Sequence, residues 1–139
     1  MRTLLTALVT LGACQAAKRK LDVPARQDAE YAQGRVKLTA LRNESAAFGL
    51  PVSRCVLQGV SAAALGLVLG RRKEHPVSAG LILGGGLSNL LERVSCGSVY
   101  DYVQFPKAPG KLKRYVFNLA DFAIFAGGLL MAAGKHGNG

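Results

Sequence analysis

The stretch from Gly84 to Asp121 decides how the rest of this chain is interpreted. It begins GGGLSNLLERVSCGSVYDYVQF (84–105), passes through a short basic link, and resumes as YVFNLAD (115–121) before an apolar run. Asp101 and Asp121 are 20 positions apart, and each stands at the edge of an apolar segment. Carboxylates in membrane-spanning sequence are costly to keep and therefore indicate function. Two that converge predict acid–base chemistry.

The composition favours a membrane protein. The 139 residues are 50% hydrophobic, the mean hydropathy is +0.22, and charge is confined to blocks between four apolar stretches. Two stretches are about long enough for a hydrocarbon core, which takes ~20 residues, and two are shorter. We expect one domain, 1–139, that is mainly α and integral to a membrane. Its four transmembrane helices are predicted at about 3–17, 52–70, 77–93 and 115–133, with polar loops at 18–50 and 94–114.

Each polar loop contains a segment with the alternation typical of a strand. RVKLTAL (35–41) and VYDYVQF (99–105) alternate polar with apolar residues at period two. The residues RNES (42–45) are expected to form a turn after the first segment. An even number of membrane spans would place both long loops, and with them Asp101 and Asp121, at the same membrane face.

Small residues predict close helix packing in two places. Glycine is a poor helix former, so four glycines in one helix indicate that a neighbouring backbone approaches closely. In the third predicted helix these are Gly80, Gly84, Gly85 and Gly86. Gly66 and Gly70 form a weaker G-x-x-x-G signal of the same kind in the second helix.

The net charge of +10 raises the alternative of a soluble nucleic-acid-binding protein. The basic residues are not interleaved with aromatic residues, and they spell no known nucleic-acid-binding module. They gather instead at Lys18–Lys20, Arg71–Lys73 and Lys111–Arg114, beside apolar stretches, where cations meet anionic lipid headgroups. We therefore expect membrane lipids, and no nucleic acid, as partners.

No metal or other cofactor is expected. The cysteines Cys14, Cys55 and Cys96 form no C-x-x-C pair, and the two histidines lack ligand spacing. The segment Leu11–Cys14 matches the end of a lipoprotein signal peptide, in which Cys14 would carry lipid after cleavage. A retained first helix is preferred, because such a match arises easily by chance in sequence rich in Leu, Ala and Gly.

Two neighbouring aspartates are sufficient for peptide hydrolysis. Carboxyl groups held close together share a proton, because both cannot ionise cheaply. The ionised one can take a proton from a water that attacks the amide carbon, while the protonated one hydrogen-bonds to the carbonyl oxygen. Each residue alone has a simpler explanation, with Asp101 solvated in a loop and Asp121 capping a helix. Asp121 is predicted to lie too deep in its apolar segment for a cap.

Three motifs resemble the signal peptidase II family in order and spacing. They are GGGLSNLLER (84–93), VYDYVQF (99–105) and FNLAD (117–121), and RNESAAF (42–48) is similar to a fourth. The resemblance implies four transmembrane helices with a small β-rich extracytoplasmic cradle, in the bacterial cytoplasmic membrane. It implies an intramembrane aspartic endopeptidase that removes signal peptides from diacylglyceryl-modified prolipoproteins, cutting just before the lipidated cysteine at the extracytoplasmic face. We expect it to act as a monomer.

The same resemblance implies roles for individual residues. Asp101 and Asp121 would be the catalytic dyad. The residues that position the substrate and the dyad would be Asn43, Asn89, Arg93 and Asn118. Cys14 stands where the family commonly has an acid, and Glu92 replaces the usual Asp. These departures leave open, as the alternative, a weakened or inactive homologue that binds lipid or peptide.

Overall fold

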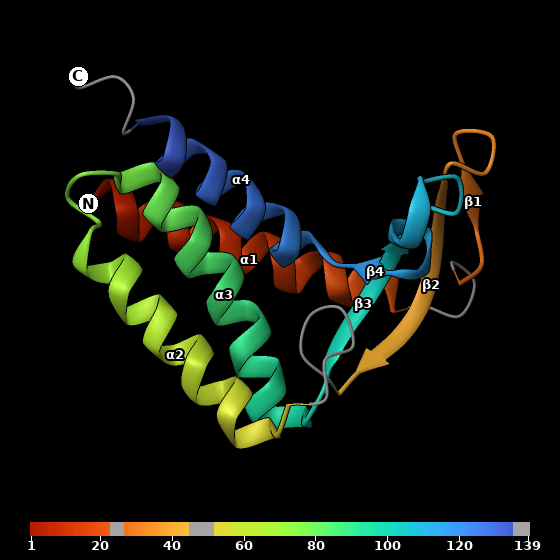
Figure 1. The fold of residues 1–139 in the computed structure, drawn as a ribbon, viewed down its shortest axis with the longest axis horizontal. Helices are drawn as coiled ribbons and strands as arrows, with labels where there is room; N and C mark the ends of the chain where they lie inside the picture. Colours follow the sequence, from red (N-terminus) through yellow and green to blue (C-terminus); the bar gives the residue numbers. More distant parts are fainter. Residues whose placement is uncertain (23–26, 45–51, 135–139) are drawn as a thin grey trace.

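The computed structural model describes residues 1–22, 27–44 and 52–134. Four helices lie side by side, and a small sheet extends from one end of them (Figure 1). The helices are α1 (Arg2–Leu21), α2 (Arg54–Gly70), α3 (Pro76–Cys96) and α4 (Leu119–Gly134). The expected combination of four helices with a small β-structure is confirmed.

The sheet is antiparallel and its strands follow the chain order. They are β1 (Glu30–Tyr31), β2 (Val36–Asn43), β3 (Val99–Gln104) and β4 (Val116–Phe117). The two segments that alternate at period two thus form β2 and β3, the central pair. Leu41 of β2 pairs with Asp101 of β3, so this aspartate lies on one of the two central strands.

Two predicted boundaries are wrong. Arg42 and Asn43 continue β2, because they pair with Tyr100 and Val99 of β3 instead of turning, and residue 45 lies outside the described residues. The last helix begins at Leu119 and not near 115, because β4 holds the preceding backbone in an extended form against β3. The second change brings the start of α4 close to Asp121.

The central helix is α3, which packs against α1, α2 and α4. A Cβ on Gly84 would lie 2.5 Å from the backbone oxygen of Ala7 in α1. A Cβ on Gly85 would lie 2.7 Å from the backbone oxygen of Ala120 in α4. A carbonyl oxygen within a helix cannot move aside as a side-chain end can. Glycine at both positions therefore lets three helices approach closely, as predicted.

The G-x-x-x-G prediction for α2 is wrong. Among the described residues, a Cβ on Gly66 or on Gly70 would meet no atom within 4 Å. Helix α2 buries none of its residues, so these glycines face outward from the protein.

Large apolar side chains are exposed on all four helices. They include Leu4, Leu8, Val60, Leu67, Leu87, Leu91, Phe125 and Leu129. Among the described residues, no helix reaches the length and hydropathy that together define a candidate membrane span.

We expect Gly84→Ala to destabilise the fold. The added methyl group would press on the Ala7 carbonyl oxygen, and overpacking of a tight contact costs about 1–3 kcal/mol. Gly66→Ala is the matched control, because a Cβ there meets only open space and alanine favours the helix. Thermal unfolding in detergent should show a lower midpoint for Gly84→Ala alone. Equal midpoints for the two variants would contradict the close contact of α1 with α3.

Candidate active site

Asp101 and Asp121 meet where the sheet joins the helices. Asp101 lies on β3 and is only 4% exposed, and Asp121 lies in the first turn of α4. The fully buried Asn118 links them. Its Nδ2 donates a hydrogen bond to Asp101 Oδ1 at 2.8 Å, and its backbone N–H donates to Asp121 Oδ2 at 2.8 Å. Two carboxyl groups from different elements thus share one buried partner.

Asp121 also caps α4, contrary to the sequence interpretation. While Asp121 Oδ2 accepts the Asn118 N–H, Asn118 Oδ1 accepts the Asp121 N–H at 3.1 Å. This reciprocal exchange, three residues apart, is a capping box. The prediction failed because it began the helix too early and so put Asp121 beyond the reach of a cap. Asp121 Oδ2 thus takes part in the helix cap, and Oδ1 faces the other residues of the site.

Asn89 connects α3 to this pair. Its Nδ2 donates to Asp121 Oδ1 at 3.2 Å, and its Oδ1 accepts from Asn118 Nδ2 at 3.1 Å. The NH₂ group of Asn89 therefore donates to a carboxylate, and its oxygen accepts from an N–H donor. Asn89 is 7% exposed, so water contributes little to these contacts.

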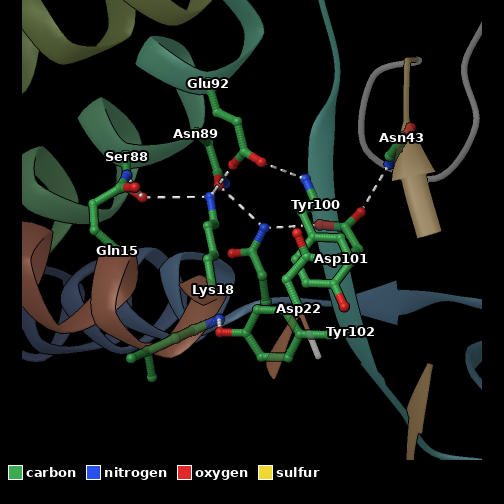
Figure 2. A network of polar contacts seen from close by, with 12 residues as sticks. Gln15, Lys18, Asp22, Asn43, Ser88, Asn89, Glu92, Tyr100, Asp101 and Tyr102 are labelled. Atoms are coloured by element: carbon green, nitrogen blue, oxygen red, sulfur yellow. Dashed lines mark hydrogen bonds and ion pairs between the residues drawn. The ribbon is translucent and has the colours of Figure 1, made fainter. Parts of the chain in front are cut away.

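Asn43, at the end of β2, completes the surroundings of Asp101. Its Nδ2 donates to Asp101 Oδ2 at 3.1 Å, and Figure 2 shows the two side chains pointing toward each other from neighbouring strands. Each oxygen of Asp101 thus accepts one amide N–H, from Asn43 and from Asn118.

Arg93 is nearby but is bonded to neither aspartate. It lies one turn after Asn89 on α3, and its charge favours the ionised form of Asp101. Its Nε is buried and has no hydrogen-bond partner in the described part of the chain, where no carboxylate comes within ion-pair distance of it either. A guanidinium in this position keeps donors free for a bound molecule.

Burial raises the pKa of the Asp101 carboxyl from 3.8 to about 6. The negative charge of Asp121 adds to this rise, while the hydrogen bonds from Asn43 and Asn118 and the charge of Arg93 oppose it. Near neutral pH this carboxyl can therefore both hold and release a proton, which is what acid–base catalysis requires.

A second polar cluster, which the sequence interpretation missed, adjoins Asn89. Lys18, near the end of α1, is 6% exposed and forms an ion pair with Glu92 of α3. Its ammonium also donates to Asn89 Oδ1 at 3.3 Å and to Ser88 Oγ at 3.4 Å (Figure 2). The sequence pattern predicts instead that Lys18 faces lipid headgroups, because the block Lys18–Lys20 follows an apolar run. The sequence signal for its burial is the spacing of four residues from Cys14, which puts Lys18 on the same helix face as a residue of that apolar run.

No cation site accompanies these groups within residues 1–22, 27–44 and 52–134, where no cluster of three or more His, Cys, Asp or Glu side chains could hold a metal ion. The three cysteines are free thiols. Cys14 is buried within the continuous helix α1, and Cys55 and Cys96 are exposed.

Known proteins resemble this chain along most of its length. The family model "Signal peptidase (SPase) II" matches residues 6–135. A lipoprotein signal peptidase of Methylobacterium sp. (strain 4-46) is 39% identical over 147 residues, which cover 92% of this chain and 86% of the relative. A lipoprotein signal peptidase of Syntrophomonas wolfei subsp. wolfei is 38% identical, over 76% of this chain and 72% of the relative.

Solved structures share the fold. A bacterial membrane enzyme determined by the in meso method at 2.3 Å resolution aligns with a TM-score of 0.83 and 19% identity, over 98% of this chain and 88% of that one. A second structure of this description, at 1.9 Å, aligns with a TM-score of 0.81 and 19% identity, over 99% of this chain and 94% of that one. Because the family model spans nearly the whole sequence and relatives near 40% identity cover most of it, the chain belongs to the signal peptidase II family.

Proposed function

We propose that Asp101 and Asp121 are the catalytic dyad of this aspartic endopeptidase, which removes signal peptides from prolipoproteins. The observation that supports this assignment is the fully buried Asn118, whose side-chain amide donates to Asp101 of β3 and whose backbone N–H donates to Asp121 of α4. Carboxyl groups held in this way share a proton and titrate as a pair.

The two aspartates have different tasks in the proposed mechanism. Asp101, which is almost completely buried and has a pKa of about 6, holds the shared proton and donates it to the carbonyl oxygen of the scissile peptide bond. Asp121, in its ionised form, takes a proton from the attacking water while its oxygens accept the N–H groups of Asn89 and Asn118. That proton then passes to the leaving amine nitrogen as the C–N bond breaks. The re-forming carbonyl returns the first proton to Asp101.

Four further residues are proposed to position the dyad and the substrate. Asn43 and Asn118 orient the Asp101 carboxyl, and Asn89 and Asn118 orient Asp121. The unpartnered Nε of Arg93 and its charge suit it to hold a carbonyl or phosphate oxygen of the substrate.

The helices are proposed to lie in the bacterial cytoplasmic membrane as four spans, with the dyad at the extracytoplasmic face. Exposed leucine, valine and phenylalanine side chains on all four helices support this, because large apolar surfaces are rarely left facing water. The same surface suits a substrate that carries two acyl chains. We therefore propose diacylglyceryl-modified prolipoproteins as the substrates, cut before the lipidated cysteine by a monomer.

Asp101→Asn and Asp121→Asn should each abolish cleavage. Asparagine keeps the size of the side chain but cannot transfer a proton, and loss of an acid–base group costs about 10²–10⁴-fold in rate. Purified protein in detergent is incubated with a diacylglyceryl-modified prolipoprotein, and release of the signal peptide is followed.

Asp28→Asn is the matched control for both variants. Asp28 is largely exposed and pairs with Lys37, so this change should leave the cleavage rate and the unfolding midpoint as in the wild type. Wild-type cleavage by either dyad variant would remove that residue from the chemistry. A folded wild type that binds the prolipoprotein without cutting it would instead favour an inactive homologue.

Asn43→Ala should shift the pH dependence of the reaction. Wild-type kcat/KM should fall about tenfold per pH unit above the pKa of Asp101, about 6, because the doubly ionised dyad has no proton to donate. The Asn43 N–H stabilises ionised Asp101, so its removal raises this pKa and the fall should begin at higher pH. If kcat/KM of Asn43→Ala falls over the same pH range as in the wild type, Asn43 does not act on this carboxyl.

The exposed cysteines can report which membrane face holds the dyad. Cys96 is the last residue of α3, shortly before β3, and Cys55 lies in the first turn of α2. Figure 1 shows these two helix ends beside the start of β3. A membrane-impermeant maleimide added to intact spheroplasts should label both thiols. A cysteine introduced as Lys73→Cys in a Cys55→Ser, Cys96→Ser background should react only after permeabilisation. The reverse labelling pattern would place the dyad at the cytoplasmic face.

A further inference from the structure

Lys18 is a buried cation placed against the proposed site. Its side chain is almost completely covered, and within the described part of the chain Glu92 is its only ion-pair partner. Burying an ammonium group is unfavourable unless it is paired and hydrogen-bonded. Cys14, one turn earlier on α1, is not an acid, so the balancing charge comes from α3.

The contact with Asn89 gives this cation a specific effect. Asn89 Oδ1 accepts from Lys18 Nζ at 3.3 Å, and the Nδ2 of the same amide donates to Asp121 Oδ1 at 3.2 Å. Turning the amide by 180° would point its NH₂ at the ammonium and its oxygen at the carboxylate, and both contacts would be repulsive. The charge of Lys18, together with the Asn118 Nδ2 that donates to the same oxygen at 3.1 Å, therefore favours the orientation in which Asn89 donates to Asp121.

Glu92 holds the ammonium in place and connects it to the sheet. One carboxylate oxygen pairs with Lys18, and the other accepts the backbone N–H of Tyr100 at 2.9 Å. Tyr100 immediately precedes Asp101 on β3. In Figure 2 the ammonium lies between α1 and α3, surrounded by Ser88, Asn89 and Glu92.

We infer that Lys18 and Glu92 are positioning residues for the reaction, and that they act through Asn89 on Asp121. The inference rests on the proposed catalytic role of Asp121. Neither residue needs to touch the substrate, because the ion pair acts by fixing which end of the Asn89 amide faces the carboxylate.

The first test is the kinetics of Lys18→Met, which removes the charge while nearly preserving the length of the side chain. We expect kcat for prolipoprotein cleavage to fall about ten- to a hundredfold, the usual effect of losing a hydrogen bond to a charged group. KM should stay within about twofold, because the interaction is with the dyad and not with the bound peptide. An unchanged kcat, or a loss confined to KM, would overturn the inference.

The second test is a double-mutant cycle of Lys18→Met with Asn89→Ala, measured under single turnover so that slow variants remain quantifiable. If Lys18 acts through Asn89, the double variant should match Asn89→Ala within about twofold. If the rate losses of the two single variants multiply in the double variant, Lys18 has an independent, structural effect and the inference is overturned.

Lys18→Met alone leaves the buried Glu92 with only the half-exposed Arg42 as an ion-pair partner in the described part of the chain, and this imbalance can prevent folding. The cycle is therefore repeated with Lys18→Met combined with Glu92→Gln, in which no buried charge is unpaired and the glutamine oxygen can still accept the Tyr100 N–H. The same match to Asn89→Ala is expected, and multiplied losses again overturn the inference.

Two controls separate this inference from the proposed function. Lys37→Met makes the same substitution at the Lys37–Asp28 ion pair, which involves neither Glu92 nor Asn89, and should leave kcat unchanged. Asp121→Asn in the same assay tests the dyad itself. Activity in Asp121→Asn would reject the proposed function, whereas an inactive Asp121→Asn beside a fully active Lys18→Met would reject only the positioning role.

Discussion

The rest of this structure depends on the buried side-chain amide of Asn118. Its oxygen accepts one N–H, and its two amide hydrogens are directed to Asn89 and Asp101, so both polar atoms of the amide are hydrogen-bonded within the protein. Through these bonds it joins α3, β3 and the start of α4 at one point. In a site of low dielectric such a network is strong when it is complete and costly when a member is missing. The side-chain amide holds the Asp101 carboxyl, and the backbone N–H of the same residue holds the Asp121 carboxyl.

Helix α3 can serve this network because of the glycines that precede its polar residues by one turn. Gly84 and Ser88 face α1, where the backbone of Ala7 and the ammonium of Lys18 lie. Gly85 and Asn89 face α4, where Ala120 and Asp121 lie. The i, i+4 spacing puts each glycine and its polar partner on one face. The same two faces of α3 therefore provide both the close helix packing and the hydrogen bonds of the site.

Much of the architecture could be predicted because its signals are local. Apolar runs indicated four helices, and period-two alternation located β2 and β3. The motif residues Asn89, Asp101 and Asn118 were identified from their resemblance to a known family. Each of these signals requires only neighbouring residues or a short motif.

The errors arose where long-range pairing overrides local pattern. Pairing of β4 with β3 delays the start of α4, and this turns Asp121 from a residue inside an apolar run into one half of a capping box. The local pattern, a basic block after an apolar run, predicts a headgroup-facing Lys18, and its partner Glu92, 74 positions away, is not visible in that pattern. Gly66 and Gly70 show the converse, a familiar motif with nothing packed against it.

Asp101 lowers the stability of the folded protein near neutral pH. Its pKa is about 6 in the folded protein against 3.8 without burial, so the folded state binds the proton more tightly. Its contribution to stability is therefore fully present below pH 3.8 and is lost as the pH rises through about 6, a change of about 3 kcal/mol. A solvated carboxylate would avoid this loss but would hold no proton near neutral pH. The burial that destabilises the fold is thus the same burial that would supply the proton in the proposed mechanism.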